Sequence, residues 1–480
     1  MNTKNGVMLI TYANSMGKNI SELHNILDRY FSGAIAGAHI LPFYPSSSDR
    51  GFSPLRYDIV DPEFGDWSDL ANLSKKYFLM YDFMINHLSS QSFQFQDFIG
   101  RKDKSPYAGM FIRYKDFWPG GEPTKEENDK IYKRKPRGPY VTVTFKDGTT
   151  EKVWCTFGED QIDLNIQNDV TWRFIKENLQ ILAGHCAAFV RLDAFAYTVK
   201  KASGTCFFEE PGVWEVLEHV QKILAPSKVE ILPEIHEHYK IQMKLAEKGY
   251  RVYDFALPML LLHALHTGET SSLTHWLRIC PRKQLTTLDT HDGIGVVDVR
   301  GLLTDEQIEK TKDIIFTKGA NAKRIYSTET YKNLDIYQIN CTYYSALGNN
   351  DDAYLIARAV QLFAPGIPQV YYVGMLAGEN DIKLIEATKN GRDINRHSYS
   401  IEEIAREVER PVVQKILKLM RFRNEFPAFE GDCEANSNGS VLTIKCVNGV
   451  YIAELTADMK SYTCTIIYAG PDGKKHKLDL

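Results

Sequence analysis

Short runs of nearly continuous apolar residues recur along the chain, each long enough for one β-strand. They are VMLITYA (7–13), AGAHILPFYP (36–45), FLMYDFMINH (78–87), AAFVRLDAFAY (187–197), VEILPEIH (229–236), VYDFALP (252–258), LTTLDTHDG (285–293) and GIPQVYYVG (366–374). Apolar residues follow one another in the middle of each run and do not alternate with polar ones. This pattern is typical of strands that are buried on both faces, as in a parallel sheet.

Most of these runs are followed by the apolar spacing of an amphipathic helix. After the first run, Asn19 can cap a helix that places Ile20, Leu23, Ile26 and Leu27 on one face. Strand followed by helix, repeated eight times, predicts an α/β protein with a (β/α)8 TIM barrel. A doubly wound open sheet is the alternative, but the sequence has neither a GxGxxG nor a GxxxxGK phosphate loop.

Two connections are much longer than the two to six residues that are usual between barrel elements. One follows the third strand and the other follows the seventh. After about residue 430 the pattern changes to alternating strands, which predicts a small C-terminal β domain. The predicted organisation is barrel 1–87, insertion 88–167, barrel 168–293, insertion 294–350, barrel 351–429 and C-terminal β domain 430–480.

Charged and polar residues gather at the C-terminal ends of the predicted strands, which is the face where a barrel keeps its active site. Three carboxylates from three strands, Asp193, Glu234 and Asp292, are expected to meet there. An isolated buried Asp–Arg pair is more often part of the architecture than of catalysis. Three like charges at one mouth cost stability, however, and so indicate a functional site.

This set of carboxylates suits retaining glycosidic chemistry, in which a nucleophile and a general acid lie roughly 5 Å apart. We expect Arg191 to keep Asp193 ionised as the nucleophile. Glu234 would be the acid/base with a raised pKa, and Asp292 would stabilise the transition state. Spacing alone leaves this order of roles open.

Other chemistries fit the sequence less well. His236 and His238 lack a third ligand at a diagnostic metal spacing, and no Lys for a Schiff base falls within the strand runs. We therefore expect no metal and no organic cofactor.

Composition narrows the class of protein. The 480 residues carry a net charge of −4, which argues against a nucleic-acid binder. Neither an 18-residue apolar stretch for a membrane span nor a convincing signal peptide is present. The eight Cys are scattered without a CxxC, which indicates reduced thiols and a cytoplasmic location.

The strand-end motifs resemble those of the α-amylase superfamily, glycoside hydrolase family 13. DFMINH (82–87) resembles its first conserved region, VRLDAF (190–195) its nucleophile region, LPEIH (232–236) its acid/base region and LDTHDG (288–293) its third-carboxylate region. By this resemblance Asp193 is the nucleophile, Glu234 the acid/base and Asp292 the transition-state stabiliser. His87, Arg191 and His291 would contact the sugar in the first subsite.

Almost the whole chain further resembles the sucrose phosphorylase subfamily, through stretches such as DRGFSP (49–54), NLDIYQ (333–338) and GRDINRH (391–397). The resemblance implies phosphorolysis of sucrose to α-D-glucose 1-phosphate and fructose through a covalent glucosyl-Asp intermediate. It also implies that Asp49 and Arg396 clamp glucose hydroxyls and that Phe52 supplies an apolar wall. Tyr132 would lie in the loop over the acceptor subsite, and Asp335, Tyr337 and Gln338 would lie in a partner loop.

The run YKRKPRGP (132–139) offers cations for the phosphate acceptor, which is an anion near neutral pH. A solvated charged loop is the plainer interpretation. Its place in the first long insertion, over the presumed mouth, favours one phosphate contact, which we expect from Arg134.

Several specificities share the same glucosyl site. Relatives of this subfamily phosphorolyse sucrose 6′-phosphate, glucosylglycerol or glucosylglycerate, and a hydrolase would differ only in admitting water. A binding-only barrel of the same superfamily is a further class, but such barrels generally have degraded carboxylates and a membrane anchor. The DIYQ stretch resembles the plain sucrose type, so sucrose is our first expectation.

Overall fold

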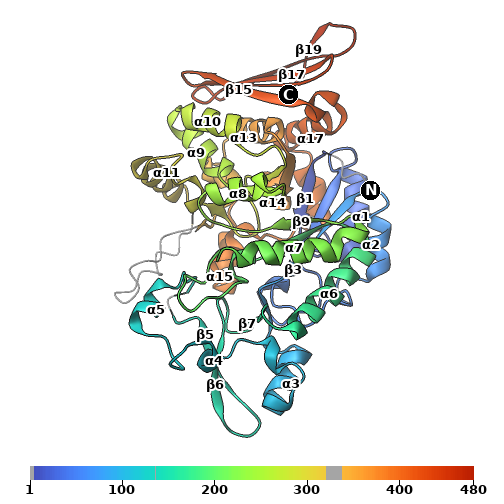
Figure 1. Cartoon of the computed structure of the whole chain (residues 1–480). Coiled ribbons are helices and arrows are strands. Elements are labelled where there is room, and N and C mark those ends of the chain that lie inside the picture. Colours follow the sequence, from blue (N-terminus) through green and yellow to red (C-terminus); the bar gives the residue numbers. More distant parts are fainter. Residues whose placement is uncertain (1–4, 136, 321–337) are drawn as a thin grey trace.

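The computed structural model describes residues 5–135, 137–320 and 338–480, and its centre is a parallel sheet of eight strands (Figure 1). The outermost strands of the hydrogen-bonded order, β9 and β10, lie next to each other, so the sheet closes nearly into a barrel. In pairing order the strands are β10 (Val252–Asp254), β11 (Gln284–Thr286), β14 (Ile367–Tyr371), β1 (Met8–Thr11), β2 (Gly37–Ile40), β3 (Phe78–Met84), β8 (Ala187–Asp193) and β9 (Glu230–Pro233).

Each strand overlaps one of the apolar runs, and the predicted (β/α)8 barrel is confirmed. The polar ends of most runs lie beyond the strands, in the loops at their carboxyl ends, whereas Asp82 lies within β3 and Arg191 and Asp193 lie within β8. Side chains such as Phe189 and Leu285 fill the inside of the barrel, while a larger apolar core lies between the strands and the helices.

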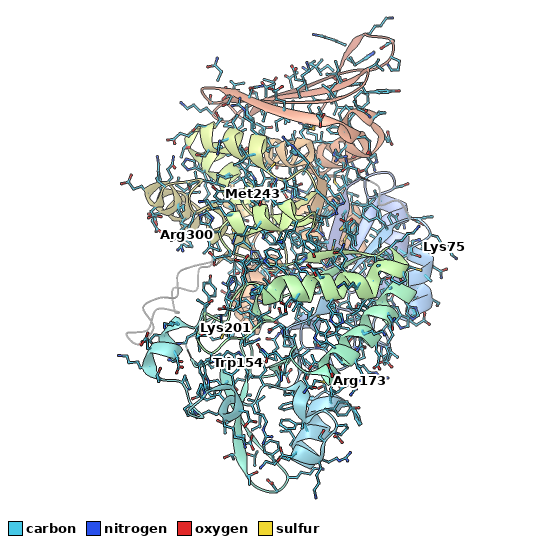
Figure 2. All side chains as sticks on the ribbon, viewed as in Figure 1. Lys75, Trp154, Arg173, Lys201, Met243 and Arg300 are labelled. Atoms are coloured by element: carbon cyan, nitrogen blue, oxygen red, sulfur yellow. A yellow bond between two sulfur atoms is a disulfide. The ribbon has the colours of Figure 1, made fainter. Side chains whose placement is uncertain are left out.

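Helices surround the barrel, and side chains fill the space between them and the strands (Figure 2). The first, α1, shows why the spacing predicted it: Asn19 caps its N-terminus, and the four predicted apolar residues are its buried ones. The surrounding helices are α1 (Ile20–Tyr30), α2 (Trp67–Leu73), α6 (Asp169–Gly184), α7 (Gly212–Leu224), α8 (Lys240–Glu247), α9 (Leu257–Thr267), α10 (Ser271–Ile279), α13 (Asp351–Phe363) and α17 (Pro411–Glu425).

Between β3 and α6 the chain forms a separate lobe, at the bottom of Figure 1. It has a small core of its own, which includes Tyr114, Trp118 and Trp154. Its elements are β4 (His87–Ser89), α3 (Phe93–Arg101), α4 (Tyr114–Phe117), α5 (Lys125–Lys130), β5 (Tyr140–Thr144), β6 (Thr150–Trp154) and β7 (Gln161–Asp163). The lobe leaves from the carboxyl end of β3, so it stands over the mouth of the barrel.

Between β11 and α13 the described part of the chain forms a two-stranded ribbon and two helices. They are β12 (Ile294–Gly295), α11 (Asp305–Thr317), β13 (Gln338–Ile339) and α12 (Tyr343–Ala346). Three further short helices follow β14: α14 (Tyr372–Met375), α15 (Ile382–Thr388) and α16 (Ile401–Glu407). Asp335 and Tyr337, predicted to contact substrate, lie outside the described residues.

A five-stranded antiparallel sheet ends the chain, at the top of Figure 1 and away from the lobe. Its strands are β15 (Asp432–Asn438), β16 (Val441–Asn448), β17 (Tyr451–Asp458), β18 (Thr463–Ala469) and β19 (Lys475–Lys477). Burial alternates along β16 and β17, as the sequence pattern predicted.

The expectation that all cysteines are reduced is wrong for one pair. Cys433 and Cys446 face each other across β15 and β16, with Cα atoms 4.1 Å apart, and form a disulfide. Their pairing follows from the strand register, which their spacing in the sequence does not reveal.

Across the described ranges, none of the helices combines the length and apolar content needed to cross a lipid bilayer.

Candidate active site

A cavity of about 480 Å³ opens at the carboxyl ends of the barrel strands. Most of the residues predicted from the sequence line it, although they come from segments that lie far apart in the chain. The predicted residues in its wall are Asp49, Phe52, His87, Arg134, Asp193, Glu234, His291, Asp292 and Gln338.

Arg191 lies at the floor of this cavity and joins three carboxylates. Its Nη1 donates to Asp82 and, at 2.8 Å, to Asp193 Oδ1, and its Nη2 lies 3.8 Å from Glu234 Oε1. Asp82 is fully buried and is also bonded to His39 Nε2 at 2.7 Å, so it fixes the guanidinium from below. The Arg–Asp pair in the middle of the apolar run therefore orients two further carboxylates.

Asp193 is the last residue of β8, and opposing influences act on the pKa of its carboxyl. Burial raises this pKa well above its usual range; Arg191 opposes the shift, and the charge of Glu234 adds to it. Arg191 thus favours the carboxylate form of Asp193, as predicted for its role, but its guanidinium is shared among three carboxylates.

Glu234 follows β9 and is held from two sides. Its Oε2 accepts a hydrogen bond from the Ala194 backbone N–H at 2.9 Å, and its Oε1 lies 3.3 Å from His236 Nε2. Ala194 has a φ of 53°, in the left-handed region that costs a non-glycine residue energy. Backbone strain is thus stored next to the carboxylate that it positions.

Asp292 sits in the loop after β11, beside a histidine and an arginine side chain. His291 Nε2 lies 3.3 Å from Asp292 Oδ2, and Arg392 Nη1 lies 3.5 Å from Asp292 Oδ1. Burial would raise the pKa of Asp292, but His291, Arg392 and Arg191 lower it below its usual range. Burial also lowers the pKa of His291 to about 3, so at neutral pH the two guanidiniums supply the positive charge that keeps Asp292 ionised.

The loop after β2 forms one wall. The Phe52 ring stacks on His291 with 4.8 Å between the ring centroids, and the Phe52 carbonyl lies 2.9 Å from His87 Nε2. Gln161, which no motif in the sequence singles out, donates to the Phe52 carbonyl at 3.0 Å and to Asp49 at 3.4 Å. It belongs to β7 of the lobe, so only the pairing of β7 with β4 brings it to the site.

Arg392 lies within the 3₁₀ turn Gly391–Asn395, and Arg396 follows that turn directly. The two side chains have different surroundings. Arg396 is buried behind the wall, and its Nε donates to the His291 carbonyl at 3.0 Å. Arg392 lines the cavity, with its Nη1 3.9 Å from Asp49 Oδ1. The side chain beside Asp49 is therefore that of Arg392, which stands in the same GRDINRH stretch as Arg396. The predicted contact of Asp49 and Arg396 with glucose hydroxyls stays a prediction.

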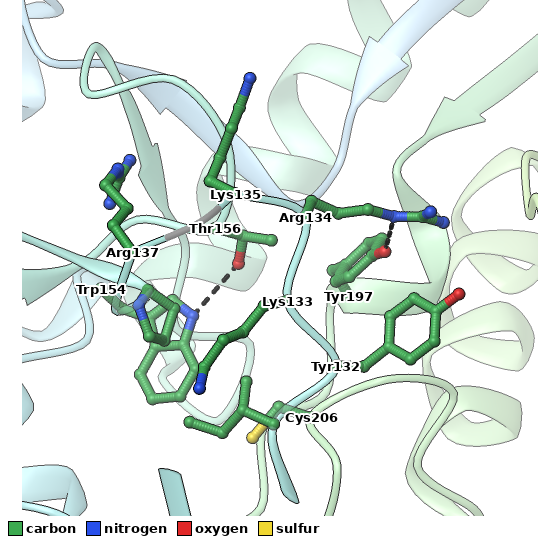
Figure 3. A pocket seen from close by; sticks show the side chains of 11 residues that line it. Tyr132, Lys133, Arg134, Lys135, Arg137, Trp154, Thr156, Tyr197 and Cys206 are labelled. Atoms are coloured by element: carbon green, nitrogen blue, oxygen red, sulfur yellow. Dashed lines mark hydrogen bonds between the residues drawn. The ribbon is translucent and has the colours of Figure 1, made fainter. Parts of the chain in front are cut away.

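The two arginines of the basic run 132–139 have different hydrogen-bond partners. Arg134 reaches the cavity, where it donates to the His236 carbonyl at 3.1 Å and to the Tyr197 hydroxyl. Arg137 donates instead to backbone carbonyls within the lobe, at Tyr140 of β5 and at Phe157, which follows β6. Figure 3 shows the two guanidiniums pointing to opposite sides.

Two other predicted residues flank Arg134. The Tyr132 ring lies under the Arg134 guanidinium, 5.1 Å away, and its hydroxyl donates to Glu237 at 2.7 Å. The Gln338 amide lies 3.1 Å from His236 Nε2. Gln338 thus lines the cavity itself, whereas Tyr132 supports Arg134 from behind the cavity wall.

Ligand-capable atoms of Glu234, His236 and Asp292 all lie within 4.8 Å of one another. Hydrogen bonds and ion pairs from Ala194, Arg191 and Arg392 already engage the two carboxylates of this group. We assign no metal to it.

Comparison with known proteins agrees with this geometry. The model of the α-amylase catalytic domain matches residues 11–251. Over 464 residues the chain is 52% identical to the sucrose phosphorylase of Streptococcus mutans, with 96% of each chain covered. Over 467 residues it is 43% identical to the glucosylglycerol phosphorylase of Marinobacter adhaerens, with 97% of each covered.

Among solved structures, that of sucrose 6F-phosphate phosphorylase from Thermoanaerobacter thermosaccharolyticum superposes with a TM-score of 0.96. The two chains are 41% identical, and the match covers 100% of this chain and 98% of the other. The resemblance inferred from the strand-end motifs is confirmed: the chain belongs to the α-amylase family, among relatives that are glucoside phosphorylases.

Proposed function

We propose that the protein is a sucrose phosphorylase. It would transfer the glucosyl group of sucrose reversibly to inorganic phosphate and give α-D-glucose 1-phosphate and D-fructose. The observation that carries this proposal is the convergence of Asp193, Glu234 and Asp292 on one cavity, with Arg191 beside the first two and Arg134 also in the cavity wall. The similarity to the Streptococcus mutans enzyme supports sucrose as the donor.

In the first displacement, an Asp193 carboxylate oxygen attacks the anomeric carbon while Glu234 donates a proton to the departing fructose oxygen. Arg191 lies closer to Asp193, at 2.8 Å, than to Glu234, at 3.8 Å. The negative charge is therefore better placed on Asp193 and the proton on Glu234.

In the second displacement, a phosphate oxygen attacks the anomeric carbon of the glucosyl-Asp193 ester and Asp193 leaves. Two inversions retain the α configuration. Asp292, which is ionised, would stabilise the positive charge that develops on the sugar in both steps. Arg134 would contact the phosphate.

The glucose would lie against the wall formed by Phe52 and His291, with His87 at its edge. We propose Asp49 and Arg392 as the residues that hold its hydroxyls, and Arg396 as the support that fixes the His291 backbone. A cytoplasmic location remains a prediction, which the use of glucose 1-phosphate inside cells supports.

A second candidate activity is phosphorolysis of sucrose 6′-phosphate. The likeness to the solved sucrose 6F-phosphate phosphorylase favours it, and the basic run would then hold the phosphate already on fructose. The glucosyl site would be unchanged.

Product analysis separates these activities. The protein is incubated with sucrose or sucrose 6′-phosphate, each with and without inorganic phosphate, and glucose 1-phosphate and free glucose are quantified. Phosphate-dependent glucose 1-phosphate from sucrose is the expected result. Turnover of the phosphorylated sugar alone would establish the second activity, and glucose release at the same rate without phosphate would make the protein a hydrolase.

Two variants serve as controls for the enzyme class. Asp193→Asn and Glu234→Gln should each abolish turnover of sucrose while the circular dichroism spectrum stays unchanged. Full activity in either variant would contradict the assigned roles.

A further inference from the structure

A fourth carboxylate, Asp298, lies behind the proposed acid/base Glu234. Asp298 Oδ2 lies 3.8 Å from His236 Nδ1, and on the other side of the imidazole His236 Nε2 lies 3.3 Å from Glu234 Oε1. The three side chains form a row, carboxylate–imidazole–carboxylate, that runs from the second insertion into the cavity.

This row is buried and incompletely bonded. Asp298 is 1% exposed, and neither of its carboxylate oxygens nor His236 Nδ1 has a hydrogen-bond partner within the described part of the chain. A buried ionisable group without hydrogen bonds is costly, so its presence needs a reason. A shift of less than 1 Å would bring Asp298 Oδ2 and His236 Nδ1 into hydrogen-bonding distance.

The surrounding chain is shaped to hold these two side chains together. Asp298 follows β12, whose Gly295 pairs with Gln338 of β13. A Cβ on Gly295 would lie 2.4 Å from Asp298 Oδ2, so the close approach requires glycine. The Phe255 ring stacks on the imidazole with 3.9 Å between centroids and fixes the ring plane.

We propose that Asp298 is a positioning residue that holds His236 as an imidazolium, so that a positive charge stands between Glu234 and an anionic acceptor. This inference rests on the proposed phosphorolysis and adds a residue to it. An imidazolium donates from both nitrogens, so the Gln338 amide would turn its oxygen toward Nε2.

The charges around His236 favour the protonated ring. Asp298 faces Nδ1, Glu234 faces Nε2, and Asp292 and Glu237 lie nearby. The cation on this side, Arg134, contacts the His236 backbone carbonyl, and Arg191 lies beyond Glu234. Burial alone would lower the pKa of His236, but Asp298 and Glu234 outweigh it and raise that pKa above its usual value.

The positive charge on His236 would assist the second displacement, in which phosphate attacks. Once Glu234 has given its proton to fructose it is a carboxylate, and the incoming phosphate is also negative. An imidazolium between them offsets their repulsion. A water molecule carries no charge and gains less from it, so Asp298 favours phosphate over water as the acceptor.

The test is Asp298→Asn, which keeps the size of the side chain and removes its charge. The histidine titration is followed by NMR, with the His236 signal assigned by its loss in His236→Gln. We expect the His236 pKa to fall by about one unit and kcat/KM for phosphate to fall about tenfold, since one unit corresponds to a factor of ten. Phosphate-free hydrolysis of α-D-glucosyl fluoride, whose leaving group needs little acid assistance, should change by less than about threefold.

The matched control is Asp381→Asn. Asp381 contacts His397 Nδ1 at 2.6 Å, which is the same type of pair away from the cavity wall, and asparagine can still cap α15. It should leave the His236 titration and the phosphate kinetics unchanged.

Two results would overturn the inference: an unchanged His236 titration in Asp298→Asn, or equal losses of phosphorolysis and glucosyl fluoride hydrolysis. If the unsubstituted protein makes no glucose 1-phosphate, the proposed function fails. The titration of His236 with and without Asp298 still tests the pair in that case.

Discussion

At the scale of single residues, the charge states in the site depend on two arginine side chains that are shared among several carboxylates. Arg191 contacts Asp82, Asp193 and Glu234, and Arg392 contacts Asp49 and Asp292. Each proposed catalytic carboxylate therefore has a different electrostatic environment. A deep position beside other carboxylates raises the pKa of Asp193, whereas the second guanidinium keeps the pKa of Asp292 low.

A pair of substitutions distinguishes the two arginines of the GRDINRH stretch. Arg392→Ala removes a cation from the cavity wall, so we expect kcat/KM for sucrose to fall about 10- to 100-fold, as for loss of a charged hydrogen bond, with an unchanged melting temperature. Arg396→Ala removes a buried support and should lower the melting temperature. Steady-state kinetics and thermal unfolding of both variants test this. A stable Arg396→Ala with the larger kinetic loss would return the clamp to Arg396.

At the scale of elements, helix α13 anchors the loop that carries His291 and Asp292. Arg358, fully buried on α13, donates to both Asp289 oxygens at 2.8 and 3.0 Å and also bonds the Tyr354 hydroxyl. Asp289 lies three residues before Asp292. The buried pair thus links a barrel helix to the site, and it explains why a second acidic residue stands in the LDTHDG motif without lining the cavity.

Removing one partner of this buried pair should destabilise the fold. Asp289→Asn leaves Arg358 with an uncompensated buried charge, which typically costs about 3–5 kcal/mol of the free energy of unfolding. Urea unfolding measures the loss. The exposed Asp313→Asn on α11 is the control and should change the free energy by less than about 0.5 kcal/mol. A small effect of Asp289→Asn would mean that the pair is not an anchor.

At the scale of the whole molecule, the barrel carries its two appendages at opposite ends, the lobe over the mouth and the C-terminal sheet behind (Figure 1). The sheet packs on α13 and on the end of α17. Phe422 of α17 and Phe426, the residue after this helix, each lie 5.2 Å from Tyr468, measured between ring centroids. The proposed active site and the surface that packs against the C-terminal sheet therefore lie on separate faces of the barrel.

Global stability should fall in mild acid because the fold buries neutral histidines. His266, bonded to the Ala346 carbonyl at 3.1 Å, has its pKa lowered by burial to about 4 from about 6.5 in the unfolded chain. The unfolded chain binds more protons, so this contribution is present above pH 6.5 and is lost as the pH falls toward 4.

For His266 alone the loss at pH 5 is about 2 kcal/mol. Urea unfolding at pH 7 and pH 5 should show a smaller pH-dependent loss in His266→Gln than in the unsubstituted protein. The same loss in both proteins would show that His266 is accessible to protons in the folded state.

The sequence by itself determined the barrel, the buried face of α1 and the alternating C-terminal strands, because these depend on periodicities that each segment carries within itself. It also placed Asp193, Glu234 and Asp292 at one mouth, because the carboxyl ends of parallel strands meet at one face. Only the tertiary structure decided that Arg392 faces the cavity, that Cys433 pairs with Cys446 and that Gln161 and Asp298 reach the site. These outcomes depend on contacts between segments that are distant in the sequence, and on the combined effect of burial and neighbouring charges on each side chain. A local sequence pattern contains no information about such contacts.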